Sequence, residues 1–305
     1  MTRLLVLLLL SSLAVTAVAV QAAGTPPDRP GDTRLWYRRP PSGWMEALPI
    51  GGGRLGAMVF GDPVRDRLQL NEETLWDGHP RDTTNPEALQ YLPRIRKLLF
   101  DGKNAEATAL APHLMGRPQG VKSYQSLGDL WTEWEHPAAA EGYRRELDLD
   151  RAVVTVEYTA GGTRFTREVF ASHPDQVIVQ RLAADGPGAL NFRLRITRRQ
   201  DARSLTEGED RLILRGQVND TPPGAKESLG LKFEAQVLAL PESGSVRAEG
   251  DSLVVRGAKA LTLLVAGATS YGGGDPAEKC RRQLRAAARK PYSRLLADHV
   301  ADHRK

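Results

Sequence analysis

The chain has 305 residues, of which 41% are hydrophobic and 26% charged, a composition that is typical of globular proteins and excludes a disordered chain. Its net charge of +5 is small for this length, and acids are interleaved with the basic residues, so no nucleic-acid partner is expected. The single cysteine, Cys280, excludes an intrachain disulfide and a cysteine-based zinc site, and its helical surroundings predict a packed residue.

The first segment has the pattern of a signal peptide. A positive charge at Arg3 precedes an apolar run over residues 4–20, and small residues follow at the cleavage positions. We predict a signal peptide over residues 1–22, a flexible Pro/Gly-rich linker over residues 23–33, and export to the periplasm or the cell exterior without membrane association after cleavage. Because the apolar run approaches the length of a membrane span, an uncleaved anchor is the alternative.

A short helical insertion follows the first strand-like runs, which lie at residues 35–38, 55–60 and 67–70. Leucine and isoleucine then recur at helical spacing, with Asn85 as a cap and Pro86 at the first helical position. Asp101 and Gly102 interrupt this pattern, so a second helix is predicted over residues 104–114.

Strand signals dominate from residue 127 to residue 268. Apolar residues alternate with polar ones, as in Val154, Val156 and Tyr158, and glycine turns separate the runs. About ten or more strands in series with few helices predict a mainly β fold, a large antiparallel β-sandwich.

Two helices are predicted at the end, over residues 276–290 and 291–305. Six residues of the second form one stripe: Tyr292, Leu295, Leu296, His299, Val300 and His303. We expect this stripe to be an interface for a partner that these 305 residues do not supply. His299 and His303 have the spacing of a metal-chelating pair, but no further ligand is near in sequence, so a solvated or interface pair is expected and no metal site.

Residues 51–56, GGGRLG, match the Gly-x-Gly-x-x-Gly pattern of dinucleotide sites. Such a site requires a helix after the glycines, whereas a strand-like run follows here and Pro49 precedes. We interpret the segment as a tight glycine turn that feeds a strand, with a glycine loop at the rim of a ligand site as the alternative. No cofactor is predicted.

Residues 71–78, NEETLWDG, combine an amide, acids and an aromatic ring, the groups with which proteins bind sugars. Neighbouring acids of a strand point to opposite faces, so Glu72 and Glu73 are poor partners for cleaving one glycosidic bond. The segment is either a loop with buried hydrogen bonds or part of a sugar site that is completed elsewhere. A further polar-aromatic patch, residues 123–130, brings Tyr124 and Gln125 as possible sugar contacts.

Together these segments resemble the N-terminal part of glycoside hydrolase family 95, the α-L-fucosidase family. The resemblance covers nearly the whole chain after the linker, in the expected order. Its segments are residues 48–61 (LPIGGGRLGAMVFG), 69–80 (QLNEETLWDGHP), 85–103, 123–130 (SYQSLGDL), 143–149, 166–180, 266–271 and 292–305. One departure is Gly52, where the family usually has asparagine between the glycines.

The resemblance implies a family-type N-terminal β-sandwich, or super-sandwich, over residues 34–272 and the start of a helical linker over residues 273–305. In that family an (α/α)6 barrel carries the inverting chemistry, and no motif of the barrel matches this sequence, so no catalytic residue is assigned. The candidates for a substrate rim are Gly51, Arg54, Asn71, Glu72, Trp76, Tyr124 and Gln125. The expected partners are the catalytic barrel, as a domain or a separate chain, and fucosylated glycans.

Two functions from different classes remain open. One is a partial α-L-fucosidase, truncated or half of a split enzyme, that assists hydrolysis only with the barrel. The other is a stand-alone glycan-binding or assembly module without enzymatic activity. The stripe on residues 292–303 favours the first, because a module that stands alone should end in a polar helix. Fucose or galactose specificity and oligomeric state are left open.

Overall fold

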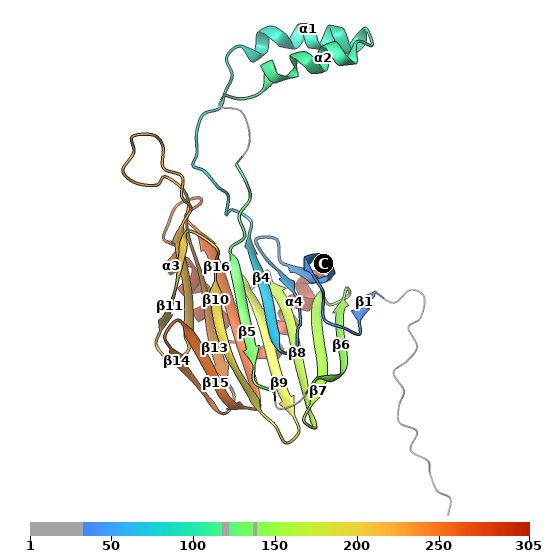
Figure 1. Cartoon of the computed structure of the whole chain (residues 1–305), viewed down its shortest axis with the longest axis vertical. Coiled ribbons are helices and arrows are strands. Elements are labelled where there is room, and N and C mark those ends of the chain that lie inside the picture. The colour runs from blue at the N-terminus through green and yellow to red at the C-terminus, as the bar shows by residue number, and fades with distance from the viewer. Residues whose placement is uncertain (1–32, 118–121, 137–138) are drawn as a thin grey trace, which may run out of the picture. The chain divides into compact units, whose positions relative to one another are not determined.

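Two antiparallel sheets packed face to face form the sandwich in the computed structural model, which describes residues 33–117, 122–136 and 139–305 (Figure 1). This arrangement confirms the predicted mainly β fold. The predicted signal peptide and the linker up to residue 32 lie outside the described residues. Among the residues that are described, no helix combines the length and the apolar character needed to cross a bilayer.

The nine-stranded sheet has the order β1-β6-β7-β8-β9-β16-β13-β12-β11. Its strands are β1 (Arg34–Tyr37), β6 (Glu141–Asp148), β7 (Val153–Ala160), β8 (Thr163–Ser172), β9 (Val177–Asp185), β11 (Ala202–Glu207), β12 (Arg211–Gln217), β13 (Lys232–Pro241) and β16 (Ala260–Thr269). The seven-stranded sheet has the order β14-β15-β10-β5-β4-β3-β2. Its strands are β2 (Leu48–Gly51), β3 (Leu55–Val59), β4 (Arg65–Glu72), β5 (Gly128–Trp134), β10 (Leu190–Thr197), β14 (Ser245–Glu249) and β15 (Ser252–Ala258).

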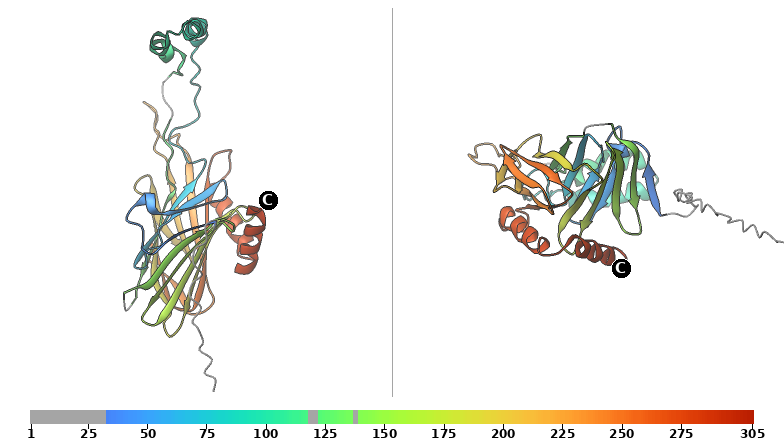
Figure 2. Two further views of the ribbon diagram at one scale, coloured as in Figure 1. Left: turned by 90° about the vertical axis from the view of Figure 1, so that its right-hand side faces the viewer. Right: turned by 90° about the horizontal axis from the view of Figure 1, so that it is seen from below.

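Strand β16 shows how the sandwich is layered. Its residues are buried on both faces, because Leu263 and Val265 belong to the core between the sheets whereas Leu264 and Ala266 pack under the C-terminal helices. Helices α3 (Pro276–Ala287) and α4 (Tyr292–His303) cover this outer face of the nine-stranded sheet (Figure 2). Cys280 is buried in this second core, which confirms the predicted packed cysteine.

The expectation that the stripe of α4 needs an absent partner is wrong. Leu295 is only 1% exposed and packs in the second core together with Phe170 of β8. The His299 ring stacks on the Phe170 ring at 4.6 Å, and its Nε2 lies 2.9 Å from the carbonyl oxygen of Arg151. The reason is that β7–β9 carry apolar residues on both faces, so the nine-stranded sheet itself supplies the partner. His299 is therefore buried against the sheet of its own chain, whereas His303 is exposed.

The helical insertion lies between β4 and β5 in the chain. It consists of α1 (Ala88–Phe100), α2 (Asn104–Leu110) and the 3-10 turn η2 (Ala111–Leu114); a further 3-10 turn, η1 (Trp44–Glu46), precedes β2. Helix α1 starts two residues later than predicted, and Asn85 instead accepts a hydrogen bond from the Glu87 N–H at 3.0 Å. The predicted second helix tightens into η2 where Pro112 lacks an amide hydrogen.

A buried ion pair joins the two sheets in the first core. Arg167 of β8 donates from Nη1 to Asp66 Oδ2 of β4 at 2.9 Å, and both side chains are almost fully buried. Asp66 Oδ1 also accepts from the backbone N–H of Gly61 at 2.7 Å. Arg167 Nη2 donates to the Tyr158 hydroxyl at 2.6 Å, so the guanidinium and the carboxylate each have several partners.

Replacing Leu295 with alanine tests the packing of α4. Leu295→Ala should lower the free energy of unfolding by about 2–5 kcal/mol, because it leaves a cavity between α4 and the sheet. Leu89→Ala is the matched control, since Leu89 is 76% exposed on α1 and its loss should change this free energy by less than about 0.5 kcal/mol. Equal effects of the two changes in urea unfolding would show that α4 does not pack on the sheet.

Histidine 136 makes the stability of the sandwich depend on pH. Burial, followed by the charge of Arg167, lowers the pKa of His136 from its ordinary 6.5 to about 4. Between these two values the unfolded chain binds a proton that the folded chain does not, so the free energy of unfolding should fall as the pH drops through this window. Urea unfolding at about pH 7 and at about pH 4.5 measures this loss.

The His136→Phe variant separates this titration from other groups. It lacks the hydrogen bond between His136 Nε2 and the Tyr158 hydroxyl, so it should be less stable at both pH values. Its further loss between the two pH values should nevertheless be smaller than that of the unchanged chain. An unchanged pH dependence would show that His136 is not held neutral in the fold.

Candidate functional site

Two segments that the sequence presents separately come together beside β4 and β5. Residues 73–80 lead from β4 into the insertion, and residues 122–127 lead back into β5. Trp76 and Tyr124 form an antiparallel bridge, flanked by a hydrogen bond of 2.8 Å from the Asp77 N–H to the Ser123 carbonyl. Their rings meet edge to face at 5.4 Å. We call these two paired segments the stem of the insertion.

An open cleft of about 630 Å³ lies beside the stem. Trp76 and Tyr271 line it, and both residues are exposed, Trp76 to 46% and Tyr271 to 65%. Leu231 adds an apolar wall, and Glu73 and His79 bring polar groups to the same cleft. An accessible pair of aromatic side chains with a few polar groups has the composition of a small-molecule site.

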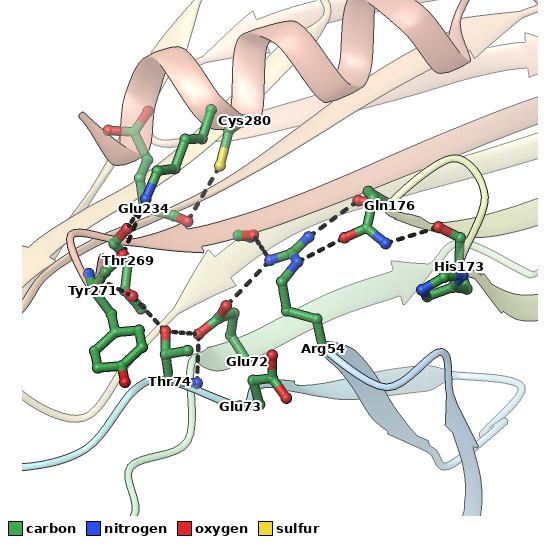
Figure 3. Close-up of polar contacts among 12 residues, drawn as sticks. Arg54, Glu72, Glu73, Thr74, His173, Gln176, Glu234, Thr269, Tyr271 and Cys280 are labelled. Carbon is green, nitrogen blue, oxygen red and sulfur yellow. Dashed lines mark hydrogen bonds and ion pairs between the residues drawn. The ribbon is translucent and has the colours of Figure 1, made fainter. Parts of the chain in front are cut away.

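Arg54 links the end of β4, where residues 73–80 begin, to the nine-stranded sheet. Its Nε donates to Gln176 Oε1 at 2.8 Å and its Nη1 donates to the Gly267 carbonyl at 2.6 Å, both in the nine-stranded sheet or its turns. The same Nη1 lies 3.2 Å from Glu72 Oε1 at the end of β4 (Figure 3). The guanidinium therefore bridges the two sheets where β4 leads into residues 73–80.

Glu72 connects Arg54 to the residues that line the cleft. It is only 2% exposed, and its Oε2 accepts from the N–H of Thr74 at 2.9 Å and from the hydroxyl of Thr74 at 2.6 Å. The hydroxyls of Thr74 and Thr269 are hydrogen-bonded, and Thr269 Oγ1 accepts from the Tyr271 N–H at 3.1 Å (Figure 3). A continuous chain of contacts thus runs from Arg54 to Tyr271.

This geometry places Arg54 and Glu72 beneath the cleft instead of at its rim. Both oxygens of the Glu72 carboxylate are engaged by the protein, so the residue supports the loop that carries Trp76. Glu73 is exposed, which confirms that the two neighbouring acids point to opposite faces. Tyr124 also reaches down, because its hydroxyl donates to the Glu72 carbonyl at 3.1 Å.

The remaining rim candidates lie away from the cleft. Gly51 ends β2, and Asn71 is half-buried in β4 opposite Gly56. Gln125 accepts from Arg198 Nη2 at 3.2 Å and lines a different, polar hollow. The reason is the alternation of an extended chain, which sends Tyr124 and Gln125 to opposite sides.

The glycine segment is a tight turn between β2 and β3, as predicted. Gly53 has a φ of +84°, a conformation that favours glycine, and the Gly52 N–H donates to the Leu55 carbonyl at 2.9 Å. A Cβ atom on Gly52 would lie 3.0 Å from the carbonyl oxygen of Ala171 and 3.2 Å from the backbone nitrogen of His173. The turn therefore approaches the end of β8 so closely that a side chain here requires the neighbouring turn to shift.

His79 and Asp220 form a polar pair at the cleft that the sequence does not single out, because 141 residues separate them. His79 Nδ1 lies 2.5 Å from Asp220 Oδ2, and Lys122 Nζ lies 3.5 Å from Asp220 Oδ1. The hydrogen bond from His79 holds the pKa of Asp220 below its usual value. An ionised carboxylate only accepts, so His79 carries a proton on Nδ1 and donates it to Asp220.

A double-mutant cycle tests the support under the cleft. Arg54→Met should lower the free energy of unfolding by about 3 kcal/mol, because it leaves the Glu72 carboxylate buried without its cation. Adding Glu72→Met should cost less than the sum of the two single changes, because no buried charge remains. The exposed pair of Arg65 and Glu133 is the control, and Arg65→Met should cost less than about 1 kcal/mol. Additive costs in urea unfolding would contradict the coupling.

Comparison with known proteins adds named relatives. The chain is 35% identical over 301 residues to alpha-L-fucosidase 2 of Arabidopsis thaliana, which covers 89% of this chain and 35% of that protein. It is 30% identical over 282 residues to probable alpha-fucosidase A of Aspergillus niger, which covers 84% of this chain and 34% of that protein. The chain thus spans about a third of the length of these curated relatives.

A solved structure and a family model agree with the fold. A putative kojibiose phosphorylase from the human microbiome superposes with a TM-score of 0.54 at 9% identity, over 89% of this chain and 34% of that chain, which supports the fold alone. Residues 35–274 match the family model described as glycosyl hydrolase family 65, N-terminal domain. Because this match covers most of the chain, the chain belongs to that family of glycosyl hydrolase N-terminal domains.

Proposed function

We propose that the chain is the non-catalytic β-sandwich domain of an α-L-fucosidase-like glycoside hydrolase of the family 95 type. It acts together with a catalytic barrel, which is a further domain or a separate chain, and it does not hydrolyse glycosides by itself. The observation that carries this proposal is the similarity to two proteins named as alpha-fucosidases, of which this chain represents about a third. The signal pattern over residues 1–22 supports export.

The acids of the candidate segment support a structural contribution instead of catalysis. Glu72 is buried and held by Arg54 and Thr74, so it is not placed to transfer a proton to a substrate. Glu73 is exposed on the cleft. A glycosidase needs a second carboxylate about 5–10 Å from the first, on the other side of the scissile bond, and in this proposal the barrel supplies the acid and the base.

Helix α1 offers a surface for the barrel. One face packs within the insertion, where Ile95 is buried and the Tyr91 ring stacks on the His113 ring at 3.9 Å. The other face carries Leu89 and Phe100, which is 89% exposed. Soluble proteins seldom leave large apolar side chains grouped on one helix face, and such a group indicates an interaction site.

The charge of α1 indicates the chemistry of the partner surface. Its basic residues are Arg94, Arg96 and Lys97, and its sequence ALQYLPRIRKLLF contains no acid. We assign this face to the barrel, at a surface that is apolar in the centre and acidic around it. The length of the relatives supports this choice of partner, because about two thirds of each of them has no counterpart in this chain.

Complex formation with a catalytic portion tests the proposed function. The chain alone should release no fucose from 2′-fucosyllactose, and it should bind the part of the Arabidopsis relative that lies outside the matched third. Phe100→Glu should weaken this binding at least about tenfold, because it places a charge in an apolar interface. Val64→Glu, an exposed valine in the turn between β3 and β4, is the control and should leave binding unchanged.

Two results would overturn the proposal. Release of fucose by the pure chain would show that it contains catalytic groups of its own. Failure of the unchanged chain to associate with the catalytic portion, in a gel filtration experiment that resolves the two, would remove the barrel as its partner.

A further inference from the structure

The walls of the cleft beside the stem are preorganised. Trp76 donates from its indole Nε1 to the Glu73 carbonyl at 3.0 Å and rests against the edge of Tyr124, so its ring is held from two sides. The backbone of Tyr271 is fixed by Thr269 and by Lys279, whose Nζ donates to the Tyr271 carbonyl at 3.3 Å. The held Trp76 ring and the fixed Tyr271 backbone reduce the conformational entropy that a ligand must remove on binding.

Exposed aromatic rings suit a sugar ring. The axial hydrogens of a pyranose form an apolar face with partial positive charge, and an aromatic ring presents a negative π-face to it. Trp76 and Tyr271 line the same cleft, whose volume of about 630 Å³ lies within the range of small-molecule sites. The cleft therefore has room for one or two sugar rings.

The polar groups of the cleft suit sugar hydroxyls. Glu73 places an exposed carboxylate at the cleft. Among the described residues, Trp76 bonds to the backbone carbonyl of Glu73 and leaves its carboxylate accessible. His79 lines the same cleft, and its ring is oriented by Asp220 through Nδ1. These two side chains can fix a neutral ring by hydrogen bonds to its hydroxyl groups.

The charge and polarity of the lining select among sugars. Glu73 and Asp77 line the cleft and Asp220 lies beside it, whereas the nearby lysines Lys122 and Lys279 contact Asp220 and the Tyr271 carbonyl. The acids of the cleft therefore disfavour an acidic sugar. Leu231 and Pro80 add apolar surface beside the rings, and a methyl group on the ligand gains more from such surface than a hydroxymethyl group.

We propose that this cleft binds one neutral 6-deoxyhexose ring, L-fucose, by stacking on Trp76 and Tyr271, with Glu73 and His79 as hydrogen-bonding partners of its hydroxyl groups. The choice of fucose among 6-deoxyhexoses rests on the proposed function. The stacking and the preference for a neutral ring rest on the cleft itself. The isolated chain suffices for binding, because every named group belongs to it.

Titration of the chain with two matched sugars tests this site. L-galactose differs from L-fucose only by a hydroxyl on the exocyclic carbon. Chemical shifts in ¹H–¹⁵N spectra should show saturable binding of L-fucose in the millimolar range, at least about threefold weaker binding of L-galactose, and no binding of glucuronate. Equal affinities for the two matched sugars would overturn the 6-deoxyhexose assignment, and no saturable binding of L-fucose would overturn the site.

Variants locate the binding. Trp76→Ala should weaken L-fucose binding at least about tenfold, whereas Trp76→Phe keeps a ring and should retain most of the affinity. Trp44→Ala is the matched control, since Trp44 is an exposed tryptophan that bonds to Gln69 outside the cleft. Tyr271→Ala should also weaken binding. Because Tyr271 is exposed, this change should not unfold the chain, and weaker binding would reflect the lost ring.

The outcomes separate this site from the proposed function. A chain that associates with the catalytic portion but does not bind L-fucose retains the function and loses the site. A chain that binds L-fucose but does not associate with the catalytic portion retains the site and loses the barrel as its partner. Equal losses in Trp76→Ala and Trp44→Ala would show that the sugar binds elsewhere.

Discussion

Strand β4 carries a buried acid near each end, and each acid is paired with an arginine that links it to the opposite sheet. Asp66 is bound by Arg167 of β8, and Glu72 is bound by Arg54, which also donates to the Gly267 carbonyl of β16. A buried charge without its partner costs several kcal/mol. A shift of β4 along its axis would leave both carboxylates buried without their arginines. The two pairs therefore favour one position of β4 relative to the nine-stranded sheet.

The same pairing positions the cleft. Glu72 is the last residue of β4, and through Thr74 it fixes the first turn of the segment that carries Trp76. The chain of contacts through Thr269 brings Tyr271 from the end of β16 to the same cleft. The candidate site is thus assembled from both sheets, and its shape depends on the sandwich being complete.

The sequence predicts the elements better than their partners. Alternation in segments such as residues 154–158 is local, so it predicts strands, and the opposite directions of Glu72 and Glu73 follow from the same period. The packing of α4 is not a local property, because it depends on Phe170 and Val179 lying on the outer face of the nine-stranded sheet. The pairing of His79 with Asp220 depends in the same way on topology. The sequence shows only that Trp76 is close to Glu72 and Glu73.

The stem has a thermodynamic consequence. The Trp76–Tyr124 bridge joins the two chain segments that enter and leave the insertion, and Trp76 is also a wall of the cleft. A partner that orders α1 and α2 restrains the stem, and a sugar ring on Trp76 restrains the same bridge. Coupling between two binding events is reciprocal, so any factor by which docking tightens sugar binding is also the factor by which the sugar tightens docking. The bridge thereby makes the occupied cleft and the docked insertion parts of one equilibrium.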